Sequence, residues 1–429
     1  MKTLVINAGS SSIKCWFQEV PDNLPASQAS QRLEPLWSAR ADWSRHSGAT
    51  TAVSAEVKIT RSGGQSISST VHSASPAGIL QPVLRALWEG DDTKVIGSPS
   101  EIGIVGHRIV HGGSKFGASV LITPDVRAGI AEQAEFAPAH NGIQLEAIQT
   151  VDHVVGTSTP QVAVFDTAFH ATLAPRAYVY PGPYSWLQQG IRRYGFHGIS
   201  VQYATRRSAE LLDAAPESLR LIVCHLGNGA SVTAVASGKS VDTSMGLTPL
   251  EGIMMGTRSG SIDPGILVYL IRRQGCTADQ LDAILNRQSG LLGVSGLSGD
   301  MREILAAIQQ GNERARLAYE IYAHRLVREI GAMLGVLGGV DAIVFTGGVG
   351  ENCAPLRQEV CDHFGYLGLR LDPAKNAAPE LDQNVAASDS KAQVLVIRAD
   401  EDWEIACECN RVASANGLSP HHSSQPVRA

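Results

Sequence analysis

Two copies of one strand–turn–strand pattern constrain the fold of this chain more than any other feature of its sequence. Residues 4–15 place apolar residues on both sides of a turn of small residues, and residues 221–235 repeat this plan. The two copies begin about 220 residues apart, a spacing that indicates a repeated domain. The pattern therefore predicts a duplicated domain with a cleft between its two copies.

Short apolar runs that end in glycine-rich turns alternate with helical patterns along the chain. The clearest helical pattern has apolar residues near the 3.6-residue period from Leu317 to Leu337, and Gly338 and Gly339 follow it. Alternating helices and strands of this kind predict an α/β fold. The expected strands are residues 4–6, 102–105, 162–165, 221–223, 342–345 and 394–397.

Two segments fall outside this alternation. Residues 34–75 are rich in Ser, Thr and Ala, and we expect a peripheral elaboration there with an edge strand at residues 57–60. Residues 413–429 are rich in Ser, Pro and His, and we expect them to form a disordered tail.

The composition excludes several classes of protein. With 44% hydrophobic and 18% charged residues, the 429-residue chain is neither disordered nor a coiled coil. No apolar run approaches the roughly 18 residues of a membrane span, and the start of the chain turns polar too soon for a signal peptide. The net charge of −6, without a run of Lys or Arg, argues against nucleic-acid binding. The seven cysteines form no Cys-x-x-Cys motif, so we expect a reducing cytoplasm and neither disulfides nor a structural zinc site.

Three turns rich in glycine or serine are candidates for phosphate or nucleotide binding. The turn at residues 10–12 offers successive backbone N–H groups close to Lys14, and residues 227–229 form a Gly-Asn-Gly turn. Each of these two turns suits either phosphate oxygens or an ordinary hairpin. Residues 345–352 end an apolar run in a glycine turn on which a nucleotide can lie. No Walker A or Gly-x-Gly-x-x-Gly motif accompanies them.

Charged residues also stand in turns next to glycines. Arg108 and Arg258 in such turns suit the recognition of a carboxylate or phosphoryl group, against the alternative of surface or structural arginines. Asp166 follows an apolar run and suits either a magnesium ligand or a helix N-cap. The acidic cluster at residues 400–402 suits either a metal site or the start of a helix.

Taken in order, these motifs resemble the acetate kinase family, which is part of the larger superfamily of acetate and sugar kinases, heat-shock chaperones and actin. The resemblance spans residues 4–406 and depends on the set of motifs rather than on any one of them. The motifs are residues 7–14, 106–113, 165–170, 194–198, 225–230, 245–264 and 345–352.

The resemblance implies an α/β fold of two duplicated actin-like, ribonuclease H-like domains with a nucleotide-binding cleft between them, usually as a homodimer. We expect an N-terminal domain at residues 1–166, and a helix at about residues 401–412 that packs back on it. We expect a C-terminal, nucleotide-binding domain at residues 167–400.

The resemblance also implies a reaction. It is the reversible, direct in-line transfer of the γ-phosphoryl group of ATP to acetate, giving acetyl phosphate and ADP, with Mg²⁺ or Mn²⁺. Elementary chemistry agrees, because a carboxylate acceptor is already ionised at neutral pH and needs no general base. The obstacle is the approach of an anion to a triphosphate, which arginines, a histidine, backbone N–H groups and Mg²⁺ overcome.

The resemblance assigns roles to residues that match the family's motifs. The catalytic positions are Asn7, Asp166, His197 and Arg258, and the metal positions are Asn7 and Glu401, with Asp166 acting on Mg²⁺ directly or through water. The substrate positions are Arg108 for the carboxylate and Val110, Ala139, Phe196 and Pro249 for an apolar pocket, and His140 matches a further cleft histidine. The ATP positions are Lys14, Ser10, Ser12, His225, Leu226, Gly227, Asn228, Gly229, Asp300, Met301, Arg302, Gly348, Val349, Gly350 and Asn352.

Three of the binding positions depart from the family pattern. Ala139 replaces the usual Leu, which predicts a larger acyl pocket and better use of propionate than is usual in the family. Met301 replaces a common aromatic residue, which bears on the choice of nucleotide base. Asp402 replaces the second Glu of the acidic pair, which favours Glu401 as the metal position.

Two alternatives stand beside an acetate kinase. A propionate or butyrate kinase of the same family differs only in its acceptor. An actin-like ATPase that moves its domains to bind a partner belongs to a different class, and it has no use for Arg108, His197 and Arg258 in these positions.

Overall fold

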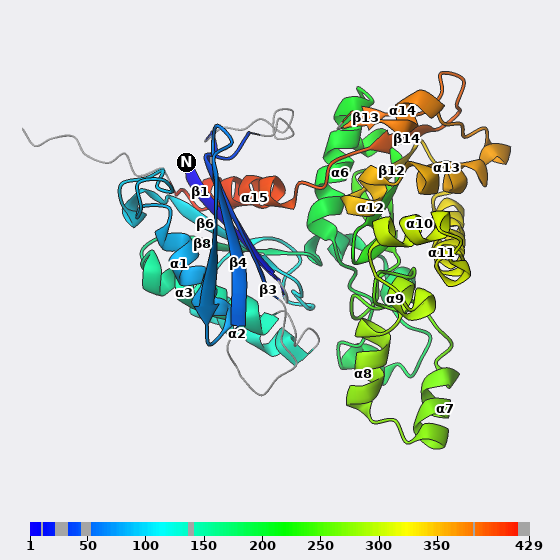
Figure 1. Ribbon diagram of the computed structural model, residues 1–429, viewed down its shortest axis with the longest axis horizontal. Helices are drawn as coiled ribbons and strands as arrows, with labels where there is room; N and C mark the ends of the chain where they lie inside the picture. Colours follow the sequence, from blue (N-terminus) through cyan, green and yellow to red (C-terminus); the bar gives the residue numbers. More distant parts are fainter. Residues whose placement is uncertain (10–11, 22–32, 44–52, 136–140, 381, 419–429) are drawn as a thin grey trace, which may run out of the picture. The chain divides into compact units, whose positions relative to one another are not determined.

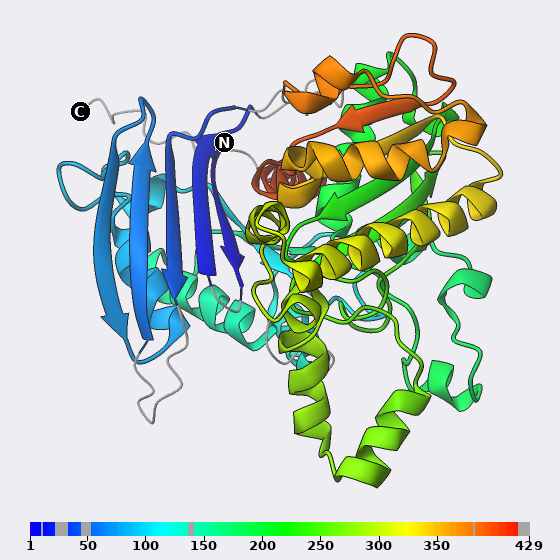
Figure 2. The same ribbon diagram turned by 45° about the vertical axis from the view of Figure 1, so that its right-hand side comes forward.

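The computed structural model describes the whole chain except residues 10–11, 22–32, 44–52, 136–140, 381 and 419–429 (Figure 1, Figure 2). The chain forms two compact units. Unit 1 comprises Met1–Ala168 together with Asp400–Ala429, and unit 2 comprises Phe169–Ala399. Each unit is built around its own β-sheet.

The sheet of unit 1 has eight strands in the order β5-β4-β3-β2-β1-β6-β8-β7. Strands β1, β6 and β8 are parallel neighbours, whereas β1 to β5 form an antiparallel meander. The strands are β1 (Lys2–Ala8), β2 (Ser12–Glu19), β3 (Trp37–Trp43), β4 (Val53–Arg61), β5 (Ser66–Ser73), β6 (Ile104–Ile109), β7 (Val120–Leu121) and β8 (Gln161–Phe165).

Helices cover both faces of this sheet. Helices α1 (Pro76–Arg85) and α3 (Asn141–Val154) pack on one face, and Val105 of β6 belongs to the core that they form. The next residue, Gly106, lies against Ile405 of helix α15 (Glu401–Ala415). Successive residues of a strand point to opposite faces, so α15 covers the other face, over β1 and β6.

The sheet of unit 2 has six strands in the order β11-β10-β9-β12-β14-β13. Strand β9 pairs antiparallel with β10 and parallel with β12, and β12 pairs parallel with β14. Five neighbouring strands thus repeat the plan of β3-β2-β1-β6-β8 in unit 1, which confirms the predicted duplicated α/β fold. The strands are β9 (Arg220–Leu226), β10 (Ala230–Ala236), β11 (Lys239–Thr243), β12 (Ala342–Thr346), β13 (Gln383–Asn384) and β14 (Gln393–Val396).

The longest helix of unit 2 is the one that the 3.6-residue pattern predicts. Helix α11 (Glu313–Leu337) begins at its N-cap Asn312, whose side chain accepts a hydrogen bond from the Ala315 N–H at 3.0 Å. It ends at Gly338, whose φ of 66° is the left-handed conformation that glycine adopts readily. No helix in the described ranges is both long and apolar enough to cross a bilayer.

The remaining helices connect the strands or lie at the edges of the two units. They are α2 (Pro124–Glu132), α4 (Pro175–Tyr178), α5 (Ser185–Gln188), α6 (Gly198–Leu211), α7 (Gly265–Gln274), α8 (Ala278–Arg287), α9 (Gly290–Ser295), α10 (Met301–Gln309), α12 (Gly347–Asn352), α13 (Ala354–Asp362) and α14 (Pro373–Ala377). Short 3₁₀ segments occur at Pro99–Glu101, Gln133–Glu135, Ala168–Thr172, Pro216–Ser218 and Gly365–Leu367.

Two expectations need correction. Residues 34–75 contain three strands rather than one edge strand, because Trp37, Ala39, Ala41 and Trp43 are buried at every second position and place β3 beside β2. Helix α15 runs through Ala415, past the expected start of the tail at residue 413, because apolar residues at its end, such as Ala413, are still buried.

The contact between Gly106 and α15 allows a test of the packing. A Cβ atom on Gly106 would lie 2.5 Å from Cys409 Sγ and 2.6 Å from Ile405 Cγ2. We predict that Gly106→Ala lowers the free energy of unfolding by about 1–3 kcal/mol, because α15 must shift away from the sheet. Urea unfolding measures this effect.

Gly331→Ala is the matched control. A Cβ atom there meets nothing within 4 Å, and the residue lies inside α11. Alanine in a helix should raise stability by about 0.5–1 kcal/mol. Parental stability of Gly106→Ala would contradict the packing described for α15.

Candidate active site

Three parallel strands of unit 1 bring Asn7, Arg108 and Asp166 to one edge of the sheet. Asn7 is the penultimate residue of β1, Arg108 is the penultimate residue of β6, and Asp166 directly follows β8. The Asp166 N–H donates to the Ile109 carbonyl at 2.9 Å, which continues the β6–β8 pairing by one step. The carboxyl ends of parallel strands lie at the same edge, where α/β proteins bind their ligands.

The Arg108 guanidinium is fixed by two neighbours at this edge. Its Nε and Nη2 donate to the two Asp166 carboxylate oxygens at 3.1 and 2.6 Å, and its Nη1 donates to Asn7 Oδ1 at 3.2 Å. A guanidinium carries five N–H groups, and these bonds use three of them. Among the described residues, two N–H groups are therefore left to bind a ligand carboxylate or phosphate.

The acidic cluster at residues 400–402 begins a helix and also faces this site. Asp400 is the N-cap of α15, and its side chain accepts from the Trp403 N–H at 3.3 Å. Glu401 accepts from Asn7 Nδ2 at 3.3 Å and lies 3.8 Å from Arg108 Nε. The first turn of a helix favours carboxylates. The same acidic residues can therefore both stabilise the start of α15 and contribute to the site.

Carboxylates outnumber cations in this cluster. Burial raises the pKa of Asp166 to about 6, with Glu401 adding to the rise and Arg108 opposing it. Burial also raises the pKa of Asp402 to about 6, and Lys14 opposes that rise. For Arg108, burial lowers the pKa, but the nearby carboxylates outweigh burial and raise it overall. An additional cation would relieve this surplus of negative charge.

The donor set fits Mg²⁺ better than a metal that requires a complete protein cage. No group of three or more His, Cys, Asp or Glu side chains is arranged around a common metal position in the described ranges. Asp166 and Glu401 instead offer hard carboxylate oxygens on one cluster. Mg²⁺ in kinases typically uses one or two carboxylates and completes its shell with water and phosphate oxygens.

Unit 2 brings together two of the predicted histidines. His197 precedes α6 with a left-handed φ of 59°, and its Nδ1 lies 3.0 Å from Ser231 Oγ. His225 lies on β9, and its Nδ1 is 2.8 Å from Ser200 Oγ. The two imidazole rings are 4.2 Å apart and tilted by 31°. A serine hydroxyl at each Nδ1 therefore fixes the orientation of both rings.

Gly229 marks the place where His197 and Arg258 come together. A Cβ atom on Gly229 would lie 3.3 Å from Arg258 Nη1 and 3.4 Å from His197 Nε2. Arg258 Nη1 also donates to the Pro249 carbonyl at 3.1 Å. A glycine backbone, an arginine and a histidine within this small region are suitable donors for the oxygens of a phosphoryl group.

The two glycine turns of unit 2 lie at one edge of its sheet. Strands β9 and β12 are parallel, and Thr346 at the end of β12 pairs with His225. Residues 227–229 follow β9 as a tight turn, and α12, which contains Gly348, Val349, Gly350 and Asn352, follows β12. Gly348 is exposed, and a Cβ atom there meets nothing within 4 Å. The turns thus have the position that nucleotide-binding turns occupy in α/β sheets.

The other predicted ATP positions differ in how accessible they are. Asp300 is the N-cap of α10 and pairs with the exposed Arg302, whereas the side chains of Met301 and Leu226 are buried. In unit 1, the exposed Lys14 pairs with Asn7 in the β1–β2 register, and Ser12 begins β2.

Two of the predicted acyl-pocket residues, Val110 and Phe196, are also buried. Three predicted site residues, Ser10, Ala139 and His140, lie outside the described residues.

Several residues that hold the site in place carry no signal in the sequence. Ser200 and Ser231 are ordinary serines until the fold places them against the two histidines. Gln144 of α3 is fully buried, accepts from the Val110 N–H at 3.0 Å and donates to the Ala8 carbonyl at 3.3 Å. It therefore fixes the ends of β1 and β6 relative to each other.

His170 holds the segment before His197. Its Nε2 lies 3.0 Å from the Phe196 carbonyl, and its Nδ1 lies 2.8 Å from Ser240 Oγ. A carbonyl oxygen only accepts, so Nε2 carries the hydrogen. Burial lowers the pKa of His170 to about 4, and the ring is neutral at physiological pH.

This neutral histidine predicts a pH-dependent effect of His170→Gln, whose amide N–H can still reach the Phe196 carbonyl. We expect the variant to be less stable than the parent at pH 7, and this deficit to shrink by about 2 kcal/mol at pH 5. Below its ordinary pKa of 6.5, His170 takes up a proton in the unfolded parent but not in the folded parent. Acid therefore destabilises the parent through this residue, and the variant lacks this contribution. Urea unfolding at both pH values measures this, and a deficit that stays constant or grows would contradict it.

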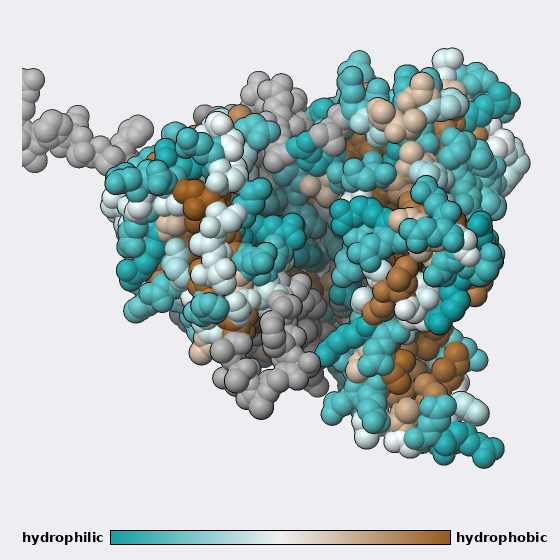
Figure 3. Space-filling model, viewed as in Figure 1, coloured by the Kyte–Doolittle hydropathy of each residue, from teal (hydrophilic) through white to brown (hydrophobic). Residues whose placement is uncertain are grey.

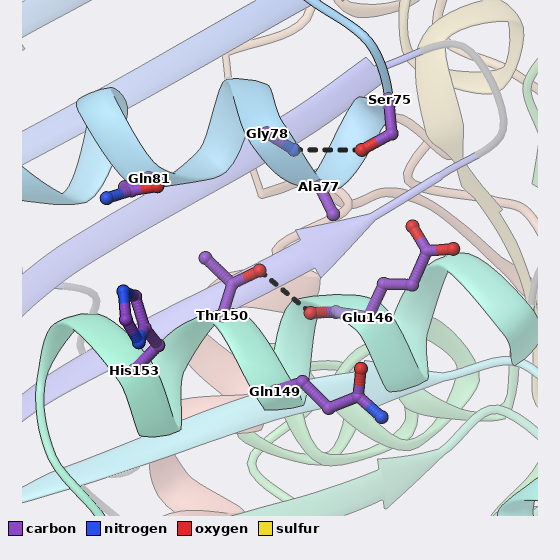
Figure 4. A pocket seen from close by; sticks show the side chains of 8 residues that line it. All are labelled: Ser75, Ala77, Gly78, Gln81, Glu146, Gln149, Thr150 and His153. Atoms are coloured by element: carbon purple, nitrogen blue, oxygen red, sulfur yellow. Dashed lines mark hydrogen bonds between the residues drawn. The ribbon is translucent and has the colours of Figure 1, made fainter.

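A groove between α1 and α3 contains none of the predicted site residues (Figure 4). Most of the residues that line it have polar side chains, and Thr150 on α3 donates to the Glu146 carbonyl of the same helix at 2.8 Å. We assign no role to this groove.

Comparison with known proteins agrees with the motifs. A family model described as the acetokinase family matches residues 2–407. The chain is 51% identical over 419 residues to an acetate kinase of Cyanothece sp., covering 98% of this chain and 100% of the relative. It is 52% identical over 409 residues to an acetate kinase of Acaryochloris marina, covering 95% of this chain and 99% of the relative.

Solved structures show the same similarity. The crystal structure of Porphyromonas gingivalis acetate kinase matches with a TM-score of 0.85 and 38% identity, covering 96% of this chain and 99% of that one. A propionate kinase from Francisella tularensis subsp. tularensis SCHU S4 matches with a TM-score of 0.84 and 35% identity over the same shares. This chain, with its duplicated actin-like fold, belongs to the acetokinase family.

Proposed function

We propose that this protein transfers the γ-phosphoryl group of ATP to acetate, reversibly and with Mg²⁺, giving acetyl phosphate and ADP. The observation that carries the proposal is the orientation of the Arg108 guanidinium by Asp166 and Asn7. The hydrogen bonds to these two residues use three of its five N–H groups, so two can bind a ligand. Acetate is a small carboxylate that such a guanidinium binds through both oxygens. The similar proteins from Cyanothece sp. and Acaryochloris marina are named acetate kinases.

In this mechanism Arg108 holds acetate as the anion. The carboxylate is ionised at neutral pH, so no residue has to remove a proton before the attack. One acetate oxygen forms a bond to the γ-phosphorus, the bond from that phosphorus to the β–γ bridging oxygen breaks, and its electron pair stays on ADP. Arg108 lowers the repulsion between acetate and the phosphates and aligns the attacking oxygen.

His197 and Arg258 act on the phosphoryl group during transfer. Their donors lie beside Gly229, where a phosphoryl oxygen can accept from both. When the Ser231 hydroxyl donates to His197 Nδ1, the hydrogen is on Nε2 and can be donated. Asp166 and Glu401, with the help of Asn7, would hold Mg²⁺, which would supply positive charge to the phosphate oxygens.

We assign the nucleotide to the glycine turns of unit 2. Residues 227–229 follow β9 and suit the phosphate chain, and the open surface at Gly348 suits a flat adenosine. Asp300 and Arg302 contribute polar groups at the start of α10. We also place the reaction in the cytoplasm, because the seven cysteines form no pattern typical of disulfide-bonded proteins.

A hydroxamate assay tests the function. With ATP, Mg²⁺ and acetate, the parent should form acetyl phosphate, and propionate and butyrate should be poorer acceptors. Arg258→Ala should lower kcat by about 10³-fold or more while the KM for ATP changes only a few-fold, because the arginine acts mainly on the group in transfer. Turnover of this variant within tenfold of the parent would exclude the role of Arg258, and no acyl phosphate from the parent would exclude the function.

We further propose that the protein is a homodimer that forms through α7. The side chains of Ile266, Val268, Tyr269 and Ile271 are each 45–59% exposed, and none of the residues of α7 is buried. Apolar residues also gather on the visible face of unit 2 around α7 and α8 (Figure 3). An apolar helix without cover is typical of an interface.

The charges at the two ends of α7 favour a second copy as the occupant. Asp263 precedes the helix, and Arg272 and Arg273 lie in its last turn, roughly 13 Å further along the axis. When two copies of α7 pack antiparallel about a twofold axis, Asp263 of each faces the arginines of the other.

Val268→Glu tests this interface by placing a charge in the middle of the helix. Light scattering after gel filtration should give the mass of a dimer for the parent and of a monomer for the variant. Leu317→Glu on α11 is the control, because Leu317 is also 50% exposed but lies elsewhere, and this variant should stay dimeric. A monomeric parent, or a dimeric Val268→Glu variant, would refute the interface.

A further inference from the structure

The loop that carries Arg258 is fastened to the preceding segment of unit 2 by three side chains. Residues 244–261, here called the arginine loop, run from the end of β11 and contain both Pro249 and Arg258. Tyr180, Arg193 and Glu251, here called the clasp, connect this loop to residues 178–195. The predicted motifs do not include Tyr180 or Arg193, and no role in catalysis follows for them from the site described above.

Arg193 binds the start of the arginine loop. Its Nη1 lies 2.9 Å from each of the carbonyl oxygens of Thr243, Ser244 and Met245. Its Nη2 donates to Glu251 Oε1 at 2.7 Å. The guanidinium therefore ties the entry of the loop to a residue in its middle.

Tyr180 completes the clasp from the other side. Its hydroxyl donates to Glu251 Oε2 and accepts from the Leu247 N–H at 3.0 Å. A Cβ atom on Gly246 would lie 1.8 Å from Glu251 Oε2 and 2.1 Å from the Tyr180 hydroxyl oxygen, so a side chain at this position would displace both groups from their present places. The Gly246 carbonyl in turn accepts from the Tyr194 N–H at 3.0 Å.

The clasp and the catalytic arginine share one short stretch of backbone. Residues 246–251 are fixed at Gly246, Leu247 and Glu251, and Pro249 lies between these points. The Pro249 carbonyl accepts from Arg258 Nη1 at 3.1 Å. A displacement of this stretch would therefore move a hydrogen-bond partner of the guanidinium itself.

Arg193 bonds to Glu251 and also interacts electrostatically with the carboxylates of Asp242 and Glu329. Burial raises the pKa of Asp242 and of Glu329, Glu251 adds to both rises, and the positive charge of Arg193 opposes both. Removal of Arg193 would leave these carboxylates without compensation, and the fold would suffer for that reason alone. Substitutions of Tyr180 and Glu251 that keep size are therefore the informative ones.

We propose that Tyr180, Arg193 and Glu251 are positioning residues that set the place of the Arg258 guanidinium through the Pro249 carbonyl. The proposal rests on the proposed function, because it assumes that Arg258 acts on the phosphoryl group. The clasp touches no reacting atom. Its contribution is to limit the positions that Arg258 adopts before the transition state forms.

Tyr180→Phe and Glu251→Gln test the clasp. Each should lower kcat for acetyl phosphate formation by about ten- to a hundredfold, since small misplacements of catalytic groups have effects of this size. The KM for ATP should stay within twofold, and the thermal unfolding midpoint should confirm that the variants are folded at the assay temperature.

Tyr178→Phe is the matched control. Tyr178 lies two residues away and packs under the Arg192 guanidinium at 3.6 Å, and the described contacts give its hydroxyl no bond to the arginine loop. Its kcat should stay within twofold of the parent. A kcat of Tyr180→Phe and Glu251→Gln that also stays within twofold would overturn the proposal.

A double-mutant cycle separates positioning from general support of the fold. In the Arg258→Ala background, Tyr180→Phe should change kcat by less than twofold, because the residue that it positions is gone. An equal loss of kcat in both backgrounds would overturn the proposal and assign the clasp to the fold alone. If Arg258→Ala itself retained parental turnover, the proposed function of Arg258 would fail instead, and the two failures are thus distinguishable.

Discussion

The buried pair of Arg108 and Asp166 is the interaction on which the site of unit 1 depends. Asp166 is 1% exposed, and a carboxylate at that depth is costly as an anion unless a cation pairs with it. Both oxygens accept from the guanidinium, and the register of β6 against β8 places the two residues side by side. The pair orients Arg108, keeps Asp166 ionised and leaves the cluster with a surplus of negative charge that a divalent cation can relieve.

Unit 2 uses the same five-strand plan for the opposite electrostatic purpose. Its corresponding strand ends carry glycine turns and the histidine His225 rather than acidic residues, and Arg258 and His197 reach the Gly229 backbone from neighbouring segments. One scaffold thus carries an edge rich in carboxylates in one unit and an edge rich in hydrogen-bond donors in the other. The chemistry resides in the residues placed at the strand ends and not in the fold itself.

The sequence was most informative where local pattern and function coincide. Apolar runs that end in polar or glycine turns predicted most of the central strands, the duplicated plan and the position of Asp166 at a strand end, and the family that the motifs resemble is confirmed. The expected turn at Arg108 is wrong, because β6 continues through this residue to Ile109. Strands β3 and β5 escaped prediction because alanines and serines carry little hydrophobic signal, although the alternation in β3 fits a sheet.

Residues that act through a distant partner escaped prediction for a different reason. Gln144 contacts strand ends far away in the sequence, and Ser200 and Ser231 gain their importance only from the histidines that face them. The clasp residues Tyr180 and Glu251 meet across 71 positions of sequence. Such pairings are decided by tertiary packing, which the order of residues along the chain does not record.

Helix α15 is the last element in sequence order, yet it belongs to unit 1, which also contains the first strand. Unit 2 is continuous in sequence, so a ribosome releases all of its residues before α15 emerges. Strands β1 and β6 have one face uncovered until then, and Glu401 and Asp402 are the last carboxylates of the acidic cluster to be synthesised. Domains usually mature in the order of their synthesis, but here unit 2 has its full set of residues before α15 is available to complete unit 1.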